Sequence, residues 1–263
     1  MSLFDVLAAE LKAERPVALA TVVAGPGVGG KLLVRPGHEP EGTLGNEDLD
    51  RVVARDTVAE LDAGRSGIRH YGPNGEARQD EVTVFIETFA PPPRMLVFGA
   101  VDFTAALVRV AKVLGYVVTV CDAREVFATT QRFPFADEVV VDWPHRLLDR
   151  VGSTLGPRDA ICVLTHDHKF DVPALQSALA TQAGYIGAMG SRRTSIERDD
   201  RLRDAGVDEA GLARIHAPIG LDLGARTPEE TAISICAEII AARTGRDDVR
   251  PLRDTDGPIH GRR

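Results

Sequence analysis

The sequence contains few cysteines, few aromatic residues and no surplus of positive charge. Its 263 residues include three cysteines, one tryptophan and 5% aromatic residues, and they carry a formal net charge of −8. This acidic balance argues against general binding to nucleic acid or to a membrane surface, because both need a basic face. No apolar run approaches the roughly 18 residues that suggest a membrane span. The charged, amphipathic N-terminal stretch does not resemble a signal peptide.

The three cysteines also indicate a compartment. Cys121, Cys162 and Cys236 lie far apart, and none belongs to a CxxC pair. An odd number of unpaired cysteines is typical of a reducing compartment, so we expect a cytoplasmic protein. Cys162 and Cys236 fall in apolar segments, where free cysteine packs as a small hydrophobic residue.

A run of three prolines, Pro91 to Pro93, predicts a division of the chain, because it disfavours both helix and sheet. Residues 1–90 are expected to form a small α+β domain, residues 91–93 a linker, and residues 94–263 a second domain. The first domain is predicted to contain helices over 3–13 and 45–64 and strands over 17–23, 31–36, 67–72 and 81–89. Asn46 is a candidate N-cap for the longer helix, and Gly64 is a candidate stop.

The second part alternates short apolar strands with helices. Strands are predicted over 94–100, 116–123, 137–143, 159–167, 184–190 and 214–220, and helices over 104–115, 172–182, 193–206 and from 227 onward. Thr227 and Glu230 form the pattern of a capping box, with Pro228 at the first helical position. This alternation predicts an α/β fold, a Rossmann-like parallel sheet with helices on both faces. Such sheets bind ligands beyond the carboxyl ends of their strands.

The loop after the first of these strands resembles a damaged nucleotide-binding loop. A GxGxxG loop would place glycine at 99, 101 and 104, and only Gly99 is present. Val101 hinders close approach of a pyrophosphate, and Asp102 adds negative charge where a phosphate needs donors. Asp102 could instead stabilise the start of its own helix. Asp122, which precedes Arg124 after the second strand, stands near the spacing of a ribose-binding acid, but an ordinary turn residue fits equally well.

The loop after the fourth strand, "THDHKFD", crowds polar groups into one turn. His166, His168 and an aspartate could bind a metal, yet the spacing of ligands typical of zinc sites is missing. We therefore favour a loop in which Lys169 and its neighbours contact a polar ligand. Asp171 could also cap the helix that follows, because Pro173 suits the first turn of a helix.

The loop after the fifth strand, "GAMGSRRT", has the features of an anion site. Gly190 frees the backbone, Ser191 offers a hydroxyl group, and Arg192 and Arg193 offer guanidinium groups at a helix start. Arginines at this position oppose the helix dipole, which favours a bound anion as the reason for their presence. Asp222 lies in the last loop at this edge, where binding and turn formation cannot be separated from the sequence.

Four long segments of the second part resemble the C-terminal domain of the XdhC/CoxI family over roughly 94–245. They are "VTVCDAREVFATTQRFPFADEVVVDWP", "VLTHDHKFDVPAL", "YIGAMGSRRT" and "PIGLDLGARTPEETAISICAEIIAAR". The resemblance implies an accessory factor for molybdenum hydroxylases such as xanthine dehydrogenase and carbon monoxide dehydrogenase. Such a factor binds the molybdenum cofactor (molybdopterin) transiently, assists its sulfuration and delivers it to the apoenzyme, without itself being an enzyme.

The resemblance is weaker in the first domain. Residues 42–48 stand where the family has a glycine-cysteine-acid segment, and this half of the chain contains no cysteine. This domain is therefore expected to be divergent. The implied partners are the molybdenum hydroxylase apoenzyme and a cysteine desulfurase, and a homodimer fits the general preference for symmetric oligomers.

Two other hypotheses remain open. The chain could be an NAD(P)-dependent oxidoreductase with an atypical phosphate loop, in which His166 or His168 would supply a proton. It could also be a docking scaffold that binds no small ligand. For the maturation-factor interpretation, the candidate cofactor-binding residues are Gly99, Asp102, Asp122, Arg124, His166, Lys169, Asp171, Gly190, Ser191, Arg192, Arg193 and Asp222. The oxidoreductase interpretation rests on Gly99 and Asp122.

Overall fold

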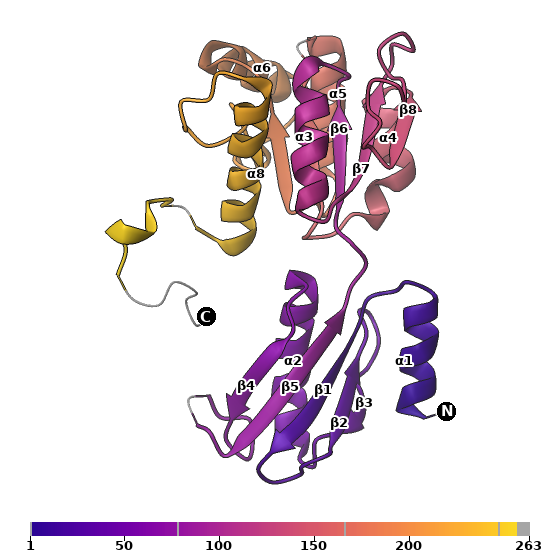
Figure 1. The fold of residues 1–263 in the computed structure, drawn as a ribbon, viewed down its shortest axis with the longest axis vertical. Coiled ribbons are helices and arrows are strands. Elements are labelled where there is room, and N and C mark those ends of the chain that lie inside the picture. The colour runs from indigo at the N-terminus through magenta and orange to yellow at the C-terminus, as the bar shows by residue number, and fades with distance from the viewer. Residues whose placement is uncertain (1, 78, 166, 247, 257–263) are drawn as a thin grey trace. The chain divides into compact units, whose positions relative to one another are not determined.

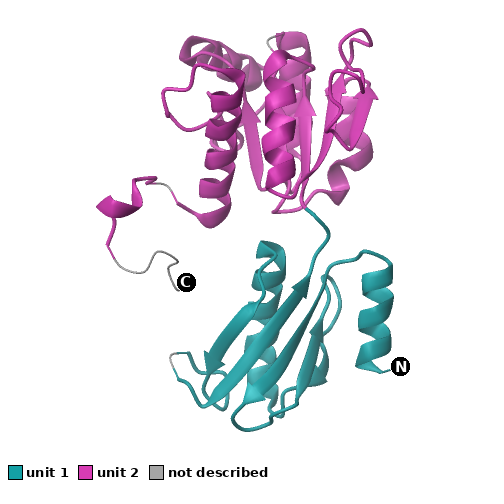
Figure 2. Cartoon of the chain, viewed as in Figure 1, with its two compact units in different colours: residues 1–92 teal, residues 93–263 magenta. Residues whose placement is uncertain are grey.

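The protein is described by a computed structural model that covers residues 2–77, 79–165, 167–246 and 248–256 (Figure 1). The chain divides into two compact units, residues 1–92 and 93–263 (Figure 2). The division falls inside the proline run 91–93. No helix in the described ranges is long and apolar enough to cross a membrane.

The first unit is an antiparallel sheet with a helix on each face. Its strands have the order β3-β2-β1-β5-β4. They are β1 (Val17–Ala24), β2 (Lys31–Val34), β3 (Glu41–Thr43), β4 (Gly67–Tyr71) and β5 (Val82–Phe89), accompanied by α1 (Leu3–Lys12) and α2 (Glu47–Ala63). Residues alternate between faces along β1. Ala20 and Val22 therefore pack with Val53 of α2, whereas Val17 packs with Val6 of α1.

The predicted ends of α2 are confirmed. The Asn46 side chain accepts hydrogen bonds from the backbone N–H groups of Asp48 and Leu49, and Gly64 ends the helix at a φ of +62°. The short strand β3 was not predicted from the sequence, because its three residues include glycine and show no apolar alternation. It pairs with β2 and forms the edge of the sheet.

The second unit is a six-stranded parallel sheet with the order β11-β10-β9-β6-β7-β8. Its strands are β6 (Arg94–Phe98), β7 (Val117–Asp122), β8 (Glu138–Val141), β9 (Ala160–Val163), β10 (Tyr185–Ala188) and β11 (Ile215–His216). The helices are α3 (Asp102–Val113), α4 (Pro144–Val151), α5 (His168–Leu179), α6 (Arg192–Asp204), α7 (Glu209–Leu212) and α8 (Pro228–Thr244), with short 3-10 turns at Gly152–Thr154 and Leu252–Asp254. The predicted Rossmann-like α/β class is confirmed.

Helices cover both faces of this sheet. The helices α3 and α8 pack side by side on one face, with α4, α5 and α6 on the other (Figure 1). The apolar residues of β6 serve both cores in alternation, since Val97 belongs to the α3–α8 side and Phe98 to the opposite side. The strand order reverses between β6 and β9, so the crevice expected to bind ligands begins at the carboxyl ends of these two strands.

One predicted helix start is wrong. Helix α5 begins at His168, four residues before the expected start at 172, and its N-cap is Asp167, which accepts a hydrogen bond from the Lys169 backbone. Asp171 therefore does not cap the helix, and Pro173 lies inside the helix. Helix α4, with Pro144 at its first turn, was not predicted at all.

The predicted capping box of α8 is confirmed. Thr227 Oγ1 accepts from the Glu230 N–H at 3.2 Å, and Glu230 Oε2 accepts from the Thr227 N–H at 3.1 Å. The helix then runs from Pro228 to Thr244 and ends at Gly245. Its N-terminal end lies next to the loop that follows β11, and both contribute residues to the candidate site.

Candidate functional site

The carboxyl edge of the parallel sheet carries the sequence-predicted residues in three groups. The first lies after β6 and β7, the second after β9, and the third after β10 and β11. The groups differ in how far their polar atoms are already used by the protein itself, and this difference decides what each group can bind.

Asp122 holds the first group together. Its carboxylate accepts hydrogen bonds from the Ala100 N–H at 2.8 Å, from Arg124 Nε at 2.9 Å and from Arg124 Nη2 at 2.7 Å. Burial alone would raise the pKa of Asp122, but the hydrogen bonds from Arg124 and Ala100 outweigh burial and lower that pKa. Asp122 therefore stays ionised as a brace between two loops. A ribose hydroxyl pair would have to replace these donors, which argues against a conventional role in binding NAD(P).

The turn after β6 is also in close contact with another part of the protein. Gly99 has a φ of +114°, and a Cβ at this position would lie 3.0 Å from the Thr165 backbone nitrogen, so the turn packs directly against the loop after β9. Asp102 lies in the first turn of α3 with a 92% exposed side chain, and its carboxylate lies 3.6 Å from Arg132 Nη2. The position of Asp102 suits the positive end of the helix dipole.

The second group contains a buried ion pair that the sequence did not indicate. Thr165 Oγ1 donates a hydrogen bond to Asp171, and Arg198 Nη2 lies 3.5 Å from Asp171 Oδ2. Arg198 Nη2 also donates to the Met189 carbonyl group, and both charged side chains are almost fully buried. Asp171 therefore links the loops after β9 and β10 from within, and its carboxylate does not face solvent.

Among the described residues, the second group also carries the exposed side chains of His168 and Lys169. Lys169 Nζ lies 3.4 Å and His168 Nδ1 lies 3.9 Å from the Asp167 carboxylate. The hydrogen bond from the Lys169 backbone is the main cause that lowers the pKa of Asp167. His166, a predicted site residue, lies outside the described residues. Within the described ranges, no cluster of three or more His, Cys, Asp or Glu side chains is arranged to hold a metal ion.

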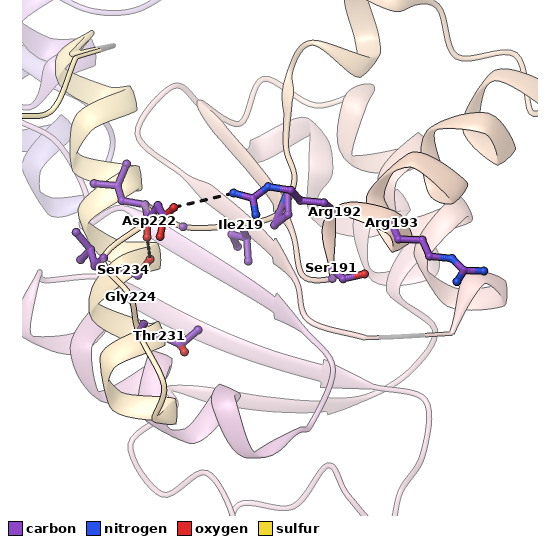
Figure 3. A pocket seen from close by; sticks show the side chains of 14 residues that line it. Ser191, Arg192, Arg193, Ile219, Asp222, Gly224, Thr231 and Ser234 are labelled. Carbon is purple, nitrogen blue, oxygen red and sulfur yellow. Dashed lines mark hydrogen bonds and ion pairs between the residues drawn. The ribbon is translucent and has the colours of Figure 1, made fainter.

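The third group surrounds a cavity of about 630 Å³ (Figure 3). Five predicted residues line it, which are Gly190, Ser191, Arg192, Arg193 and Asp222. The Arg192 and Asp222 side chains extend toward each other across the cavity, with Nη2 and Oδ2 4.0 Å apart, and they are 88% and 90% exposed (Figure 3). Because this long contact is weak and open to solvent, both side chains are available to a ligand. A volume of this size suits a small organic molecule.

Helix α6 points its N-terminus at the same cavity. Ser191 is its N-cap and accepts a hydrogen bond from the Thr194 N–H at 3.1 Å. The two predicted arginines, Arg192 and Arg193, point in different directions. Arg192 reaches across the cavity, whereas the Arg193 guanidinium points away from it and pairs with Glu197 at 2.9 Å (Figure 3). The cavity therefore presents one guanidinium group and the positive end of a helix dipole to an anion.

The opposite wall, residues 217–225, is held in place by α8. The Gly220 N–H donates to Glu238 Oε2 at 2.7 Å, and Ser234 Oγ donates to the Leu221 carbonyl group. Glu238 also accepts a hydrogen bond from the Tyr185 hydroxyl group, and His216 Nδ1 lies 3.3 Å from its other oxygen. Sequence reasoning missed this bracing, because Glu238 lies in an apolar helix far from the loop. Three residues of this wall contribute apolar surface to the cavity, namely Ile219, Leu221 and Leu223.

These features define a Rossmann-like domain with an open cavity beside β10 and β11. Residues 95–239 match the family model described as the XdhC Rossmann domain, and residues 10–72 match that of the XdhC and CoxI family. The first match covers more than half of the chain. The chain belongs to the XdhC and CoxI family.

Two curated relatives carry informative names. The chain is 33% identical over 165 residues to a probable xanthine dehydrogenase subunit from Bacillus subtilis (strain 168), which covers 62% of this chain and 47% of that protein. It is 33% identical over 89 residues to the molybdenum cofactor insertion chaperone PaoD of Escherichia coli (strain K12), which covers 34% of this chain and 28% of that protein. The matched region thus spans less than half of each relative.

A solved structure shares the fold along the whole chain. It is the crystal structure of a protein described as a xanthine dehydrogenase from Bacillus halodurans, with a TM-score of 0.52 and 20% identity. The match covers 96% of this chain and 98% of that chain. At this identity the likeness shows the fold alone.

Proposed function

We propose that this chain is a maturation factor that binds the molybdenum cofactor and delivers it to a molybdenum hydroxylase of the xanthine dehydrogenase type. The observation that carries the proposal is the cavity with Arg192 and Asp222 at its mouth, on a chain that belongs to the XdhC and CoxI family. The name of PaoD, a molybdenum cofactor insertion chaperone, supports the same role. The protein would act in the cytoplasm, where its free cysteines stay reduced.

The cavity offers complementary groups to a phosphorylated pterin. Arg192 and the N-terminus of α6 would attract the phosphate group, because both present positive charge. The Asp222 carboxylate would accept hydrogen bonds from the N–H groups of the pterin ring. Ile219 and Leu221 would contact the ring through apolar surface.

The cysteines favour delivery over sulfur transfer as the role of this chain. All three are buried. Burial raises the pKa of Cys121 and of Cys236 to about 12 each, and it raises the pKa of Cys162 as well. A thiol acts as a nucleophile in its thiolate form, so these groups are poorly suited to carry sulfur. We propose that sulfuration, where it accompanies delivery, draws sulfur from a partner such as a cysteine desulfurase.

Equilibrium dialysis with molybdopterin tests the proposal. Arg192→Ala should weaken binding about tenfold or more, because it removes a charged hydrogen-bond donor. Arg193→Ala is the matched control, since the two arginines are adjacent and 88% and 89% exposed. Arg193 also lines the cavity, but its guanidinium group points away from it and pairs with Glu197 (Figure 3). Asp222→Asn should weaken binding as well.

Transfer to a partner is measured separately. Wild-type protein loaded with cofactor should activate a molybdenum hydroxylase apoenzyme, and Arg192→Ala should do so less than Arg193→Ala. Absence of molybdopterin uptake by the wild type would refute the proposal. Capture of the apoenzyme without any uptake of a small ligand would instead favour the docking-scaffold hypothesis.

A further inference from the structure

The two halves of the carboxyl edge differ in how far their polar groups are bonded within the protein. On the β6–β7 half, the polar groups at which a Rossmann domain receives a nucleotide are already used by the protein. On the β10–β11 half, Arg192 and Asp222 stand exposed over a cavity of about 630 Å³.

Arg124 occupies the carboxylate of Asp122 on the β6–β7 half. Its side chain donates to both oxygens of Asp122, and its backbone N–H donates to Oδ1 at 2.9 Å. The guanidinium group also lies over the Phe127 ring, 4.6 Å from the ring centroid. The Arg132 guanidinium lies 5.5 Å from the same centroid. These contacts hold Arg124 beside the carboxylate that stands at the spacing of a ribose-binding acid.

The start of α3 is unsuited to a pyrophosphate. Val101 brings a branched side chain to the position where the second glycine of a nucleotide loop lets the backbone approach phosphate. Asp102 presents an exposed carboxylate in the first helical turn. A phosphate group at this position would meet a like charge, which is unfavourable.

We infer that the domain binds its ligand wholly on the β10–β11 half and accepts a phosphomonoester while rejecting a dinucleotide, with Arg124 as a specificity-determining residue. The inference deepens the proposed function and rests on it for the identity of the ligand. A dinucleotide bound in the usual Rossmann position would need the Asp122 carboxylate for its ribose hydroxyl groups, and Arg124 already holds that carboxylate. Arg124 therefore acts by occupying Asp122 and not by touching the ligand.

Calorimetry with molybdopterin and with its dinucleotide form tests this specificity. Wild-type protein should bind molybdopterin roughly tenfold or more tightly than the dinucleotide form. Arg124→Ala removes the guanidinium donors from both oxygens of Asp122 and leaves only the backbone N–H groups of Ala100 and of residue 124. It should therefore raise the affinity for the dinucleotide form and for NAD+. Arg203→Ala is the matched control, because its side chain is 45% exposed, like that of Arg124, and pairs with acidic residues near the end of α6. Equal affinity of the wild type for both forms, or no gain in Arg124→Ala, would overturn the inference.

Inorganic phosphate gives a test that does not depend on the molybdenum cofactor. In a titration followed by backbone amide NMR, the largest shifts should fall on residues 191–194 and 222–224. Largest shifts on residues 99–104 would show that the β6–β7 half accepts phosphate and would overturn the inference. Shifts at 191–194 without any molybdopterin binding would leave the inference standing and remove the proposed function.

Discussion

The buried pair of Asp171 and Arg198 gives the sharpest prediction about stability. Their side chains are 4% and 3% exposed, and no solvent can compensate either charge if its partner is removed. Breaking a buried pair in this way costs about 3–5 kcal/mol. We therefore expect Asp171→Ala and Arg198→Met each to lower the free energy of unfolding of the second unit by about that amount. This is a large part of the roughly 5–15 kcal/mol of a typical domain.

The double variant distinguishes a paired charge from general disruption. Removing both charges leaves no uncompensated ion, so the combined loss should fall short of the sum of the single losses by about 2 kcal/mol. The remaining loss reflects the Met189 carbonyl group and the Thr165 hydroxyl group, which lose their partners.

Tryptophan fluorescence during urea unfolding measures the free energy of unfolding of the second unit. Trp143 is the single tryptophan of the chain and lies in the second unit, and its ring centroid is 4.8 Å from that of Phe170 in α5. Asp200→Ala is the control, because the exposed pair of Asp200 and Arg203 lies on the same helix as Arg198. This control should show no measurable loss. Strict additivity of the two single losses, or a loss below about 1 kcal/mol in Arg198→Met, would refute the reasoning.

Three further predictions concern other parts of the fold. Cys121 and Cys236 should resist iodoacetamide at pH 8 in the native protein and react after unfolding in urea, as measured by mass spectrometry; rapid native labelling would contradict their raised pKa values of about 12. Burial alone would raise the pKa of Glu238, but its hydrogen bonds outweigh burial and hold that pKa below the ordinary 4.5. The ionised carboxylate therefore stabilises the fold fully above about pH 4.5, and this stabilisation is lost as the pH falls through the lowered pKa. Glu238→Gln should therefore reduce the loss of stability between pH 6 and pH 3 in urea titrations, and an unchanged acid limb would contradict this. Gly99→Ala should lower the free energy of unfolding by about 1–3 kcal/mol, because it strains the backbone and brings a Cβ against the loop after β9. Gly156→Ala is the control, because it has open space around it and should lower the free energy of unfolding much less in the same fluorescence assay.

Elements whose signals are local were predictable from the sequence. The cap at Asn46 and the capping box at Thr227 and Glu230 depend on residues within a few positions of each other, and the structure contains both. The start of α5 was misplaced because two local signals competed. Pro173 suits a first helical turn, but Asp167 supplies the cap six residues earlier, and the helix accommodates the proline inside.

The site was less predictable, because availability for a ligand depends on partners that are remote in sequence. The sequence placed Asp122 and Asp171 at the carboxyl edge of the sheet, which is where both lie. Each is nevertheless buried and bonded within the protein, Asp122 to Ala100 and Arg124, and Asp171 to Thr165 and Arg198. Nothing near Asp171 in the sequence indicates that an arginine of the next helix reaches it.

The partners of each side chain also explain why Arg192 and Asp222 are the better candidates for ligand contact. Their 4.0 Å separation in solvent gives each a partner that a ligand can replace at little cost. A phosphate would exchange one weak contact of Arg192 for a stronger one, and a ring N–H group would do the same for Asp222. Asp122, by contrast, would have to give up several buried hydrogen bonds before it could accept a ribose. The balance of these two exchanges favours a ligand at the cavity beside β10 and β11 over one at the remnant of the glycine loop.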